Sequence, residues 1–302
     1  MKVLVTGGTG FIASHLVDAL IKRKHSVTAV DKGGLSYRNP SVKYVFDDLS
    51  NPEAAGRVIK DCDIVFHLAS NYSVVKSTED PRFDFENNVT LTFNVLEAMR
   101  RNDVKKIVLA STSAVYGVQK KFPIKEDVPA QIRPISNYAA GKLASETYIH
   151  SFSHLYGMEG LILRIANIVG PRSNHGLVPD IVRKVQKTPK KIEVLGSGMQ
   201  KKSYMHVSDC VAAMTTAAEK YRRFDIFNVG YEEWMTVKEI VEIVCDEMKA
   251  SPKIAYTGGE AGWSGDVPEF ILDVSKIKSL GWRPKMNIEE AIRDTVRWSV
   301  KQ

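Results

Sequence analysis

A tyrosine and a lysine lie four residues apart in the stretch SNYAAGKLASE, as Tyr138 and Lys142. The stretch is rich in good helix formers, and Ser136 or Asn137 could cap the helix. Residues at positions i and i+4 share one face of a helix. A lysine ammonium beside a phenol stabilises the phenolate, so Tyr138 could act as a base near neutral pH. The same spacing occurs on ordinary surface helices, so its meaning depends on context.

A cluster of hydroxyl side chains, STSAVYG at residues 111–117, follows the apolar run IVLA. If that run is a strand of a parallel sheet, the cluster lies at the carboxyl edge, where ligands bind. Thr112 would then present its hydroxyl beside Tyr138 and a substrate. Taken alone, the cluster fits a Ser/Thr-rich turn equally well.

A glycine-rich motif, VTGGTGFIASHL, begins at residue 5 and connects an apolar run to a helical pattern. It matches G-x-G-x-x-G/A, with Ala13 at the last position. The glycines allow a tight turn and close approach to a pyrophosphate, which the helix N-terminus attracts. The residues of this motif expected at the cofactor are Gly7, Gly10, Phe11 and Ile12.

An aspartate, Asp31, ends the second apolar run, about 20 residues beyond the glycines. A carboxylate at this point would hold the ribose hydroxyls of the adenosine and repel a 2′-phosphate. The sequence therefore favours NAD over NADP.

The composition is that of a globular protein, with 44% hydrophobic and 25% charged residues among 302. The net charge of +7 comes from scattered lysines and arginines, which suit a small anionic substrate and predict no nucleic-acid partner. No apolar run is long enough to cross a bilayer, and the start resembles no signal peptide. Cys62, Cys210 and Cys245 form no metal-ligand pattern and are expected to be reduced thiols in a cytoplasmic protein.

Strand-like runs alternate with helical patterns through the first half of the chain, which predicts an α/β fold. The predicted strands are 2–6, 26–31, 42–49, 63–70, 105–112 and 159–170, and the predicted helices are 11–24, 88–101 and 138–155. We therefore expect a Rossmann-type, doubly wound parallel sheet within residues 1–170, with returning segments near 202–231. Residues 171–302 are expected to form a smaller substrate-binding region with helices at 236–248 and 287–300.

Together these motifs resemble the extended short-chain dehydrogenase/reductase family, in particular its nucleotide-sugar epimerase and dehydratase branch. The resemblance covers essentially the whole chain. It rests on the glycine motif, Asp31, DDL at 47–49, HLAS at 67–70, NNV at 87–89, STSAVYG, the Tyr138–Lys142 pair, LRIANIVGPR at 163–172 and GDVP at 265–268.

The resemblance implies a bound NAD with contacts along the first region. Asp48 and Leu49 would flank the adenine, and Asn88 would support the site. The remaining positions implied to line the dinucleotide are Leu68, Ala69, Ser70, Tyr138, Lys142 and Ala166.

The resemblance also implies substrate contacts. Thr112 would hydrogen-bond the reacting sugar hydroxyl, and Asn167 would lie near the sugar diphosphate. His175 and Val178, within NHGLVPDIV at 174–182, would belong to the nucleobase pocket. Lys202 stands where the family has an arginine on the diphosphate. Further departures from the family pattern are Tyr72, His206, Trp263 and Ser264.

The hydroxyl cluster discriminates within the branch. Dehydratases of the family resemble TDEVYG and sugar-acid decarboxylases resemble TSEVYG, whereas this chain has Ser113 and Ala114 at those positions. Without a carboxylate there, elimination and decarboxylation lack their usual acid, so the resemblance implies a 4-epimerase, with UDP-glucose and UDP-galactose as expected substrates. The resemblance also implies a homodimer built on helices 88–101 and 138–155.

Three alternatives remain. The first is a 4-epimerase of another nucleotide sugar, such as UDP-N-acetylglucosamine or UDP-glucuronate. The second is an oxidoreductase that releases reduced cofactor. The third is a non-catalytic NAD-binding regulator.

Overall fold

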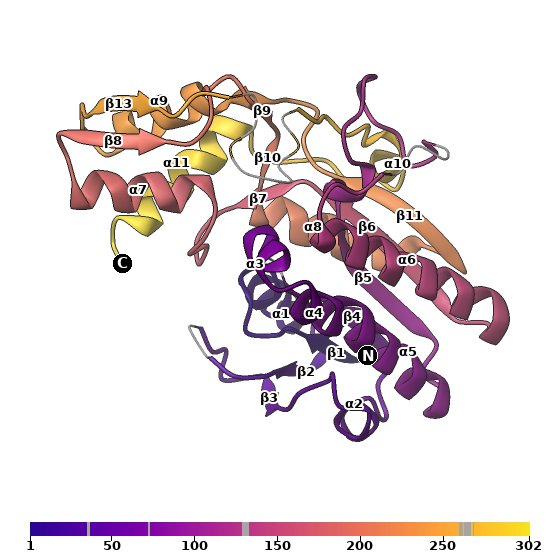
Figure 1. Cartoon of the computed structure of the whole chain (residues 1–302). Helices are drawn as coiled ribbons and strands as arrows, with labels where there is room; N and C mark the ends of the chain where they lie inside the picture. The colour runs from indigo at the N-terminus through magenta and orange to yellow at the C-terminus, as the bar shows by residue number, and fades with distance from the viewer. Residues whose placement is uncertain (35–36, 72, 129–132, 260–261, 263–266, 268) are drawn as a thin grey trace. The chain divides into compact units, whose positions relative to one another are not determined.

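The computed structural model describes the chain except for residues 35–36, 72, 129–132, 260–261, 263–266 and 268 (Figure 1). The chain forms two compact units. The first comprises Met1–Val115, Ile132–Arg164 and Met214–Phe227, and the second comprises Tyr116–Gln131, Ile165–Ala213 and Asn228–Gln302. This division lies close to the predicted boundary at 170. It differs in assigning residues 116–131 to the second unit and in returning only 214–227 to the first.

The first unit is built on a seven-stranded sheet, which confirms the predicted doubly wound α/β fold. The strands are β1 (Lys2–Thr6), β2 (Ser26–Asp31), β3 (Lys43–Phe46), β4 (Ile64–His67), β5 (Lys106–Thr112), β6 (Glu159–Ile165) and β11 (Phe224–Val229). Their order in the sheet is β3-β2-β1-β4-β5-β6-β11. The order reverses at β1 and β4, which pair in parallel, so their carboxyl ends form the switch point where ligands bind in such sheets.

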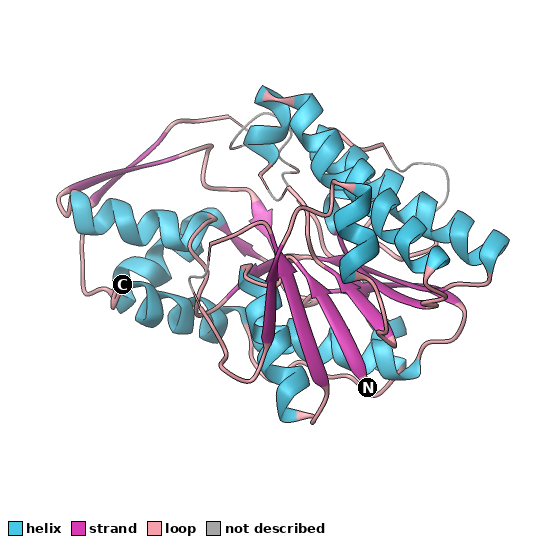
Figure 2. Cartoon of the chain, turned by 90° about the horizontal axis from the view of Figure 1, so that it is seen from below, coloured by secondary structure: helices cyan, strands magenta, loops and turns pink. Residues whose placement is uncertain are grey.

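Helices lie on both faces of this sheet, as Figure 2 shows. The helices that lie wholly within this unit are α1 (Phe11–Lys22), α2 (Pro52–Val58), α3 (Val74–Glu79), α4 (Pro81–Phe85), α5 (Leu91–Arg101) and α6 (Asn137–Tyr156). The Ser136 hydroxyl caps α6 by accepting a hydrogen bond from the amide of Ala139. A π-helical turn, Glu86–Thr90, precedes α5, so the predicted helix 88–101 begins with an irregular turn that contains Asn88.

The second unit is built from short strand pairs and helices. Strands β7 (Asn167–Val169) and β10 (Tyr204–His206) pair in parallel, as do β8 (Lys191–Val194) and β13 (Lys253–Tyr256), while β9 (Lys201–Lys202) and β12 (Met235–Thr236) are antiparallel. The helices are α7 (Leu177–Lys187), α9 (Val237–Glu247), α10 (Ser275–Ser279) and α11 (Ile288–Ser299). Helix α8 (Val207–Lys220) begins in this unit and ends in the first, since the division falls at residue 214. The single strand predicted at 159–170 is interrupted at Ala166, where the chain leaves β6 and begins β7.

Two expectations about composition can be compared with the structure. All three cysteines are free thiols, with Cys210 and Cys245 buried. Every helix in the described part of the chain is too short or too polar to span a bilayer.

A buried ion pair ties α6 to the sheet. Arg164 on β6 meets Glu146 on α6 at 2.7 Å, and only 4% of each side chain is exposed. The Ser111 hydroxyl donates a further hydrogen bond to the same carboxylate. Each charge would be strongly destabilising if left alone in this environment, so the pair fixes the position of α6.

Replacing one partner of this pair should therefore destabilise the protein. We expect Arg164→Met to lower the free energy of unfolding by about 3–5 kcal/mol, because the Glu146 carboxylate loses its buried counter-charge. The exposed pair Arg82–Glu86 provides the control. Arg82→Met should change the free energy of unfolding by less than about 1 kcal/mol. Urea unfolding measures both, and similar losses in the two variants would contradict the prediction.

Candidate cofactor and catalytic site

The glycine motif forms a turn that only glycine fits. Gly7 has a φ of +65°, and a Cβ atom there would lie 2.7 Å from the backbone nitrogen of Ala69. A Cβ at Gly8 would lie 2.5 Å from the Ala29 side chain. The amide of Gly10 donates to the Gly7 carbonyl at 2.9 Å and closes the turn just before α1. The glycine turn thus lies against the chain that leaves β4, and it leads into the N-terminus of α1, where backbone amides favour an anion.

Asp31 is fixed by the same turn. Its carboxylate accepts hydrogen bonds from the Thr9 amide at 3.1 Å and the Thr9 hydroxyl at 2.7 Å. The neighbouring Lys32 contacts the Asp48 carboxylate at 3.1 Å and the Asn87 side chain at 2.9 Å. Because the Lys32 ammonium already has these partners, the carboxylate of Asp31 remains the group at the end of β2 that suits ribose hydroxyls.

The expected adenine positions lie on an ordered turn after β3. Burial raises the pKa of Asp48, but hydrogen bonds from Ser50 and Lys32 outweigh it and hold that pKa below its ordinary value. Leu49 is buried, and its carbonyl accepts a hydrogen bond from Asn94 at 3.3 Å. This turn is therefore held from the side of α5.

The segment after β4, Leu68 to Ser70, is held by a hydrogen bond to the neighbouring strand β1. The amide of Ala69 donates to the Thr6 hydroxyl, which lies 2.7 Å from Nδ1 of His67. Nε2 of His67 is 3.1 Å from the Thr92 hydroxyl, so a fully buried histidine joins β1, β4 and α5. Burial and the nearby Lys142 lower the pKa of His67 to about 3, which makes it a neutral structural group at physiological pH.

Tyr138 and Thr112 come together, as predicted. Tyr138 is near the start of α6 and Thr112 ends β5, and a hydrogen bond links their side chains. Burial nevertheless raises the pKa of Tyr138 to about 12, although the Thr112 hydrogen bond opposes this. The expected lowering by a lysine is absent, because Lys142 Nζ instead donates to the Ala110 carbonyl at 2.9 Å.

Lys142 is a buried cation with 3% of its surface exposed. Burial lowers its pKa to about 8, while the carboxylates of Asp84 and Glu146 act in the opposite direction. The ammonium form therefore depends on acidic neighbours.

Asn88 lies in the π-helical turn and has one unsatisfied atom. Its side-chain nitrogen donates to Asp84 at 3.0 Å, whereas its buried Oδ1 has no hydrogen-bond partner among the residues that the structure describes. A buried acceptor of this kind calls for a donor that those residues do not provide. Together with the glycine cradle and Asp31, it fits a dinucleotide with free hydroxyl groups.

The predicted substrate residues in the second unit have different environments. Asn167 is half-buried at the start of β7, directly after buried Ala166. His175 is exposed before α7 and Val178 is fully buried within it. Lys202 is buried in β9, and its ammonium donates to the Val267 carbonyl at 2.6 Å.

Four residues that depart from the family pattern can also be placed against the structure. His206 is buried, with its ring nitrogens 2.7 Å from the Ser208 hydroxyl and 3.1 Å from the Asp294 carboxylate. Tyr72, Trp263 and Ser264 lie outside the described residues.

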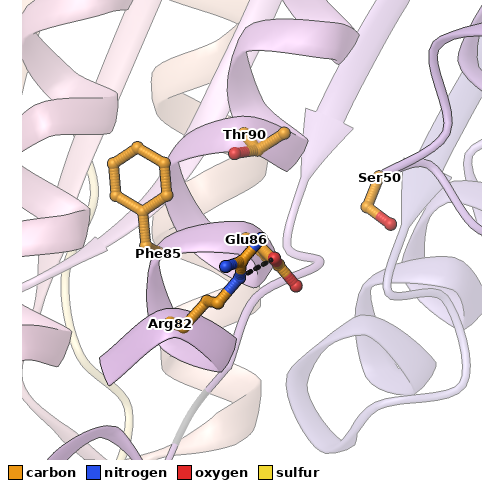
Figure 3. Close-up of a pocket in the computed structure, with 5 residues that line it drawn as sticks. All are labelled: Ser50, Arg82, Phe85, Glu86 and Thr90. Carbon is orange, nitrogen blue, oxygen red and sulfur yellow. Dashed lines mark hydrogen bonds and ion pairs between the residues drawn. The ribbon is translucent and has the colours of Figure 1, made fainter. Parts of the chain in front are cut away.

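A pocket of about 530 Å³ lies in the first unit, apart from Tyr138 and Thr112. Figure 3 shows its lining residues, with the Arg82–Glu86 ion pair on one side and Ser50 on the other. Ser50 also donates to Asp48, so this pocket borders the expected adenine position. None of its lining residues was among the predicted site residues. The described residues hold no group of three or more histidine, cysteine or acidic side chains arranged for a metal ion.

Comparison with known families gives a match over most of the chain. Residues 3–230 match the NAD dependent epimerase/dehydratase family. This chain is a member of that family. The resemblance inferred from the motifs is thereby confirmed, and NAD is the cofactor of the family.

Relatives within the family align along nearly their full length. The UDP-glucose 4-epimerase of Mycolicibacterium smegmatis is 31% identical, covering 99% of this chain and 98% of the relative. The UDP-glucuronate 4-epimerase of Thermodesulfobacterium geofontis is also 31% identical, covering 98% and 95%. The crystal structure of the Thermotoga maritima UDP-glucose 4-epimerase with UDP-glucose has a TM-score of 0.92 at 32% identity, covering 100% of this chain and 99% of that one.

Two contributions to the family site could not be seen in its motifs. Thr9 stands at a variable position of the glycine motif, yet it holds Asp31. Asp84 is four residues before Asn88, and that spacing is the one signal in the sequence that they share a helical face.

The turn at Gly7 provides a direct test of the NAD site. Gly7→Ala should weaken NAD binding about tenfold or more, because its methyl group would meet the Ala69 backbone. Gly157→Ala is the matched control, since Gly157 has the same φ of +65° with open space around it. It should cost about 1–2 kcal/mol of stability and leave NAD affinity unchanged. Calorimetric titration with NAD measures the affinity, and equal affinity of both variants would refute this role for Gly7.

Proposed function

We propose that the protein is an NAD-dependent 4-epimerase that interconverts UDP-glucose and UDP-galactose. The hydrogen bond between Thr112 and Tyr138 is the observation that supports this best, because it joins a hydroxyl-binding group to a proton acceptor. Ser113 and Ala114 follow Thr112 and leave no carboxylate for elimination or decarboxylation. The named relatives support the same class of reaction.

NAD would be held by the glycine turn at its pyrophosphate, by Asp31 at the ribose and by Asp48 and Leu49 at the adenine. Leu68, Ala69, Ser70, Asn88 and Ala166 would complete its surroundings. When bound, NAD⁺ supplies the hydride acceptor for the sugar carbon, and its positive ring favours the phenolate of Tyr138.

The chain's own residues would manage the proton. Thr112 would orient the C4 hydroxyl of the sugar toward Tyr138, which takes its proton as the 4-keto sugar forms. Lys142 would contribute positive charge beside the phenolate. After the keto sugar turns its opposite face, Tyr138 would return the proton. Because the cofactor ends each cycle in its starting state, turnover needs no second substrate.

The nucleotide end of the substrate would be held by the second unit. We assign Lys202 to the diphosphate, where its ammonium acts as a point charge and not as a bidentate fork. Asn167 would contact the sugar diphosphate, and the segment with His175 and Val178 would border the nucleobase. Val178 would act through the packing of α7, because its side chain is fully buried.

An assay without added cofactor tests the proposal. Purified protein is incubated with UDP-glucose, and UDP-galactose is sought by chromatography. Conversion supports the epimerase. Conversion of only UDP-N-acetylglucosamine or UDP-glucuronate would change the sugar, and a UDP-glucuronate 4-epimerase is among the relatives. A requirement for stoichiometric NAD would indicate an oxidoreductase, and NAD binding without turnover of any of these sugars would indicate a regulator.

Loss of the Tyr138 hydroxyl should abolish the reaction selectively. We expect Tyr138→Phe to lower kcat by about 10²–10⁴ while NAD still binds, because the proton acceptor is removed and the ring is kept. Tyr148→Phe removes a hydroxyl from the exposed side of the same helix and should retain activity. Steady-state kinetics and NAD titration decide the matter, and an active Tyr138→Phe variant would exclude Tyr138 as the base.

We further propose a homodimer formed through α5 and α6. These helices pack together in the first unit (Figure 1) and expose aromatic side chains to solvent. Phe93 on α5 is 41% exposed and contacts Tyr148 on α6, which is 40% exposed, at a ring-centroid distance of 5.6 Å. Leu155 and Tyr156 extend this surface along α6. Contiguous apolar surface of this kind is typical of an interface.

A charge placed on this surface should separate the subunits. We expect Phe93→Asp to shift the protein from dimer to monomer, because an unpaired carboxylate would be buried at the contact. Phe46→Asp is the control, since Phe46 is also exposed but lies on the edge strand β3. Sedimentation measures the mass, and a wild-type monomer or an intact Phe93→Asp dimer would disprove this interface.

A further inference from the structure

Asp84 is a buried carboxylate that the proposed mechanism does not use. It lies on α4 with 1% of its surface exposed. Its Oδ1 accepts hydrogen bonds from the side-chain amides of Asn71 at 2.7 Å and Asn88 at 3.0 Å. Asp84 forms no ion pair with any residue that the structure describes. A carboxylate kept from water in this way requires a positive charge nearby.

Gly141 lets this carboxylate approach the catalytic face of α6. A Cβ atom at Gly141 would lie 3.1 Å from Asp84 Oδ2 and 3.0 Å from the Asn88 Cβ. Glycine within a helix costs about 1 kcal/mol relative to alanine, so its presence here needs a reason. Gly141 and Lys142 lie three and four positions after Tyr138, so each of them neighbours Tyr138 on the surface of α6. The gap at Gly141 therefore brings Oδ2 of Asp84 to the side of α6 that carries Tyr138.

The other charged groups around Lys142 are already paired or neutral. Glu146, one turn further along α6, is paired with Arg164 on β6. His67 on β4 is held neutral by burial. From β5 comes only the Ala110 carbonyl, which accepts from Lys142. Among the residues that the structure describes, Asp84 is thus the carboxylate without an ion pair that acts on this cation.

We propose that Asp84 is a positioning residue, a fixed counter-charge that keeps Lys142 cationic beside Tyr138, with Gly141 as the gap that admits it. This inference rests on the proposed function only for its effect on turnover. The direction of the electrostatic effect on the lysine agrees, since Asp84 raises the pKa of Lys142 against the lowering caused by burial. The same carboxylate also raises the pKa of Tyr138, so its benefit to turnover lies in the charge of Lys142. Removing the carboxylate should then release the Lys142 proton at lower pH.

The decisive experiment is a titration of Lys142 itself, followed by NMR of isotope-labelled lysine side chains and assigned with Lys142→Met. In Asp84→Asn the midpoint should fall by about one pH unit, because the replacement keeps the shape and removes the charge. Glu79→Gln, which removes an exposed carboxylate from neighbouring α3, should leave it unchanged. An unchanged midpoint in Asp84→Asn, or an equal shift in both variants, would overturn the inference.

A second variant covers the case in which Asp84→Asn fails to fold. Gly141→Ala keeps every charge but pushes the carboxylate away, so the midpoint should shift in the same direction by a smaller amount. Gly56→Ala in α2 is its control, since a Cβ there meets open space. A midpoint in Gly141→Ala that matches the Gly56→Ala value would count against the role of Asp84.

Kinetics separate this inference from the proposed function. In Asp84→Asn, the alkaline decline of kcat should move to lower pH with KM nearly unchanged, whereas a purely structural defect would lower kcat equally at every pH. If the wild-type protein has no epimerase activity, the NMR titration still tests Asp84. If Tyr138→Phe is inactive and Asp84→Asn keeps the wild-type pH profile, the function survives and the inference fails.

Discussion

The carboxyl ends of β1 and β4 come so close that the backbone at Gly7 has no room for a side chain against Ala69. This contact follows from the strand order, because successive strands are added outward from β1 on one side and from β4 on the other. It places the glycine turn, the start of α1 and the segment after β4 around one point. The Thr6 hydroxyl at the end of β1 and the His67 ring at the end of β4 are hydrogen-bonded to each other, which holds the same two strands together. Most of the expected cofactor contacts in the first unit depend on that arrangement.

Burial of ionisable side chains is the main constraint at Tyr138 and Lys142. Lys142 is nearly inaccessible to solvent, so its ammonium form is destabilised unless nearby carboxylates offset the loss of solvation. Tyr138 has the corresponding problem, because its phenolate is disfavoured by the same burial. Lys142 does not offset this burial in the structure, because its ammonium donates to the Ala110 carbonyl. A positive cofactor ring beside Tyr138 would favour the phenolate.

The sequence predicted the elements that obey simple periodicity. Strands β1 and β2 begin and end where the pattern placed them, and the Thr236–Glu239 capping box at α9 is present. It also predicted the Tyr138–Thr112 pairing, because motifs at the carboxyl edge of parallel strands must converge. The break at Ala166 was not predictable, since LRIANIV contains no glycine or proline that would mark the end of a strand. The π-helical turn around Asn88 and the approach of Asp84 to Gly141 depend on tertiary contacts that no local pattern encodes.

The division of the chain has a consequence for its modularity. The backbone passes from one unit to the other after residues 115, 131, 164, 213 and 227, so each unit is assembled from three separated segments. Neither unit can be excised as one continuous piece, and no single cut separates them. Each must also close loops that run through the other, and such long-range closure slows folding. The two units therefore share one interleaved chain, unlike domains that are joined by a linker.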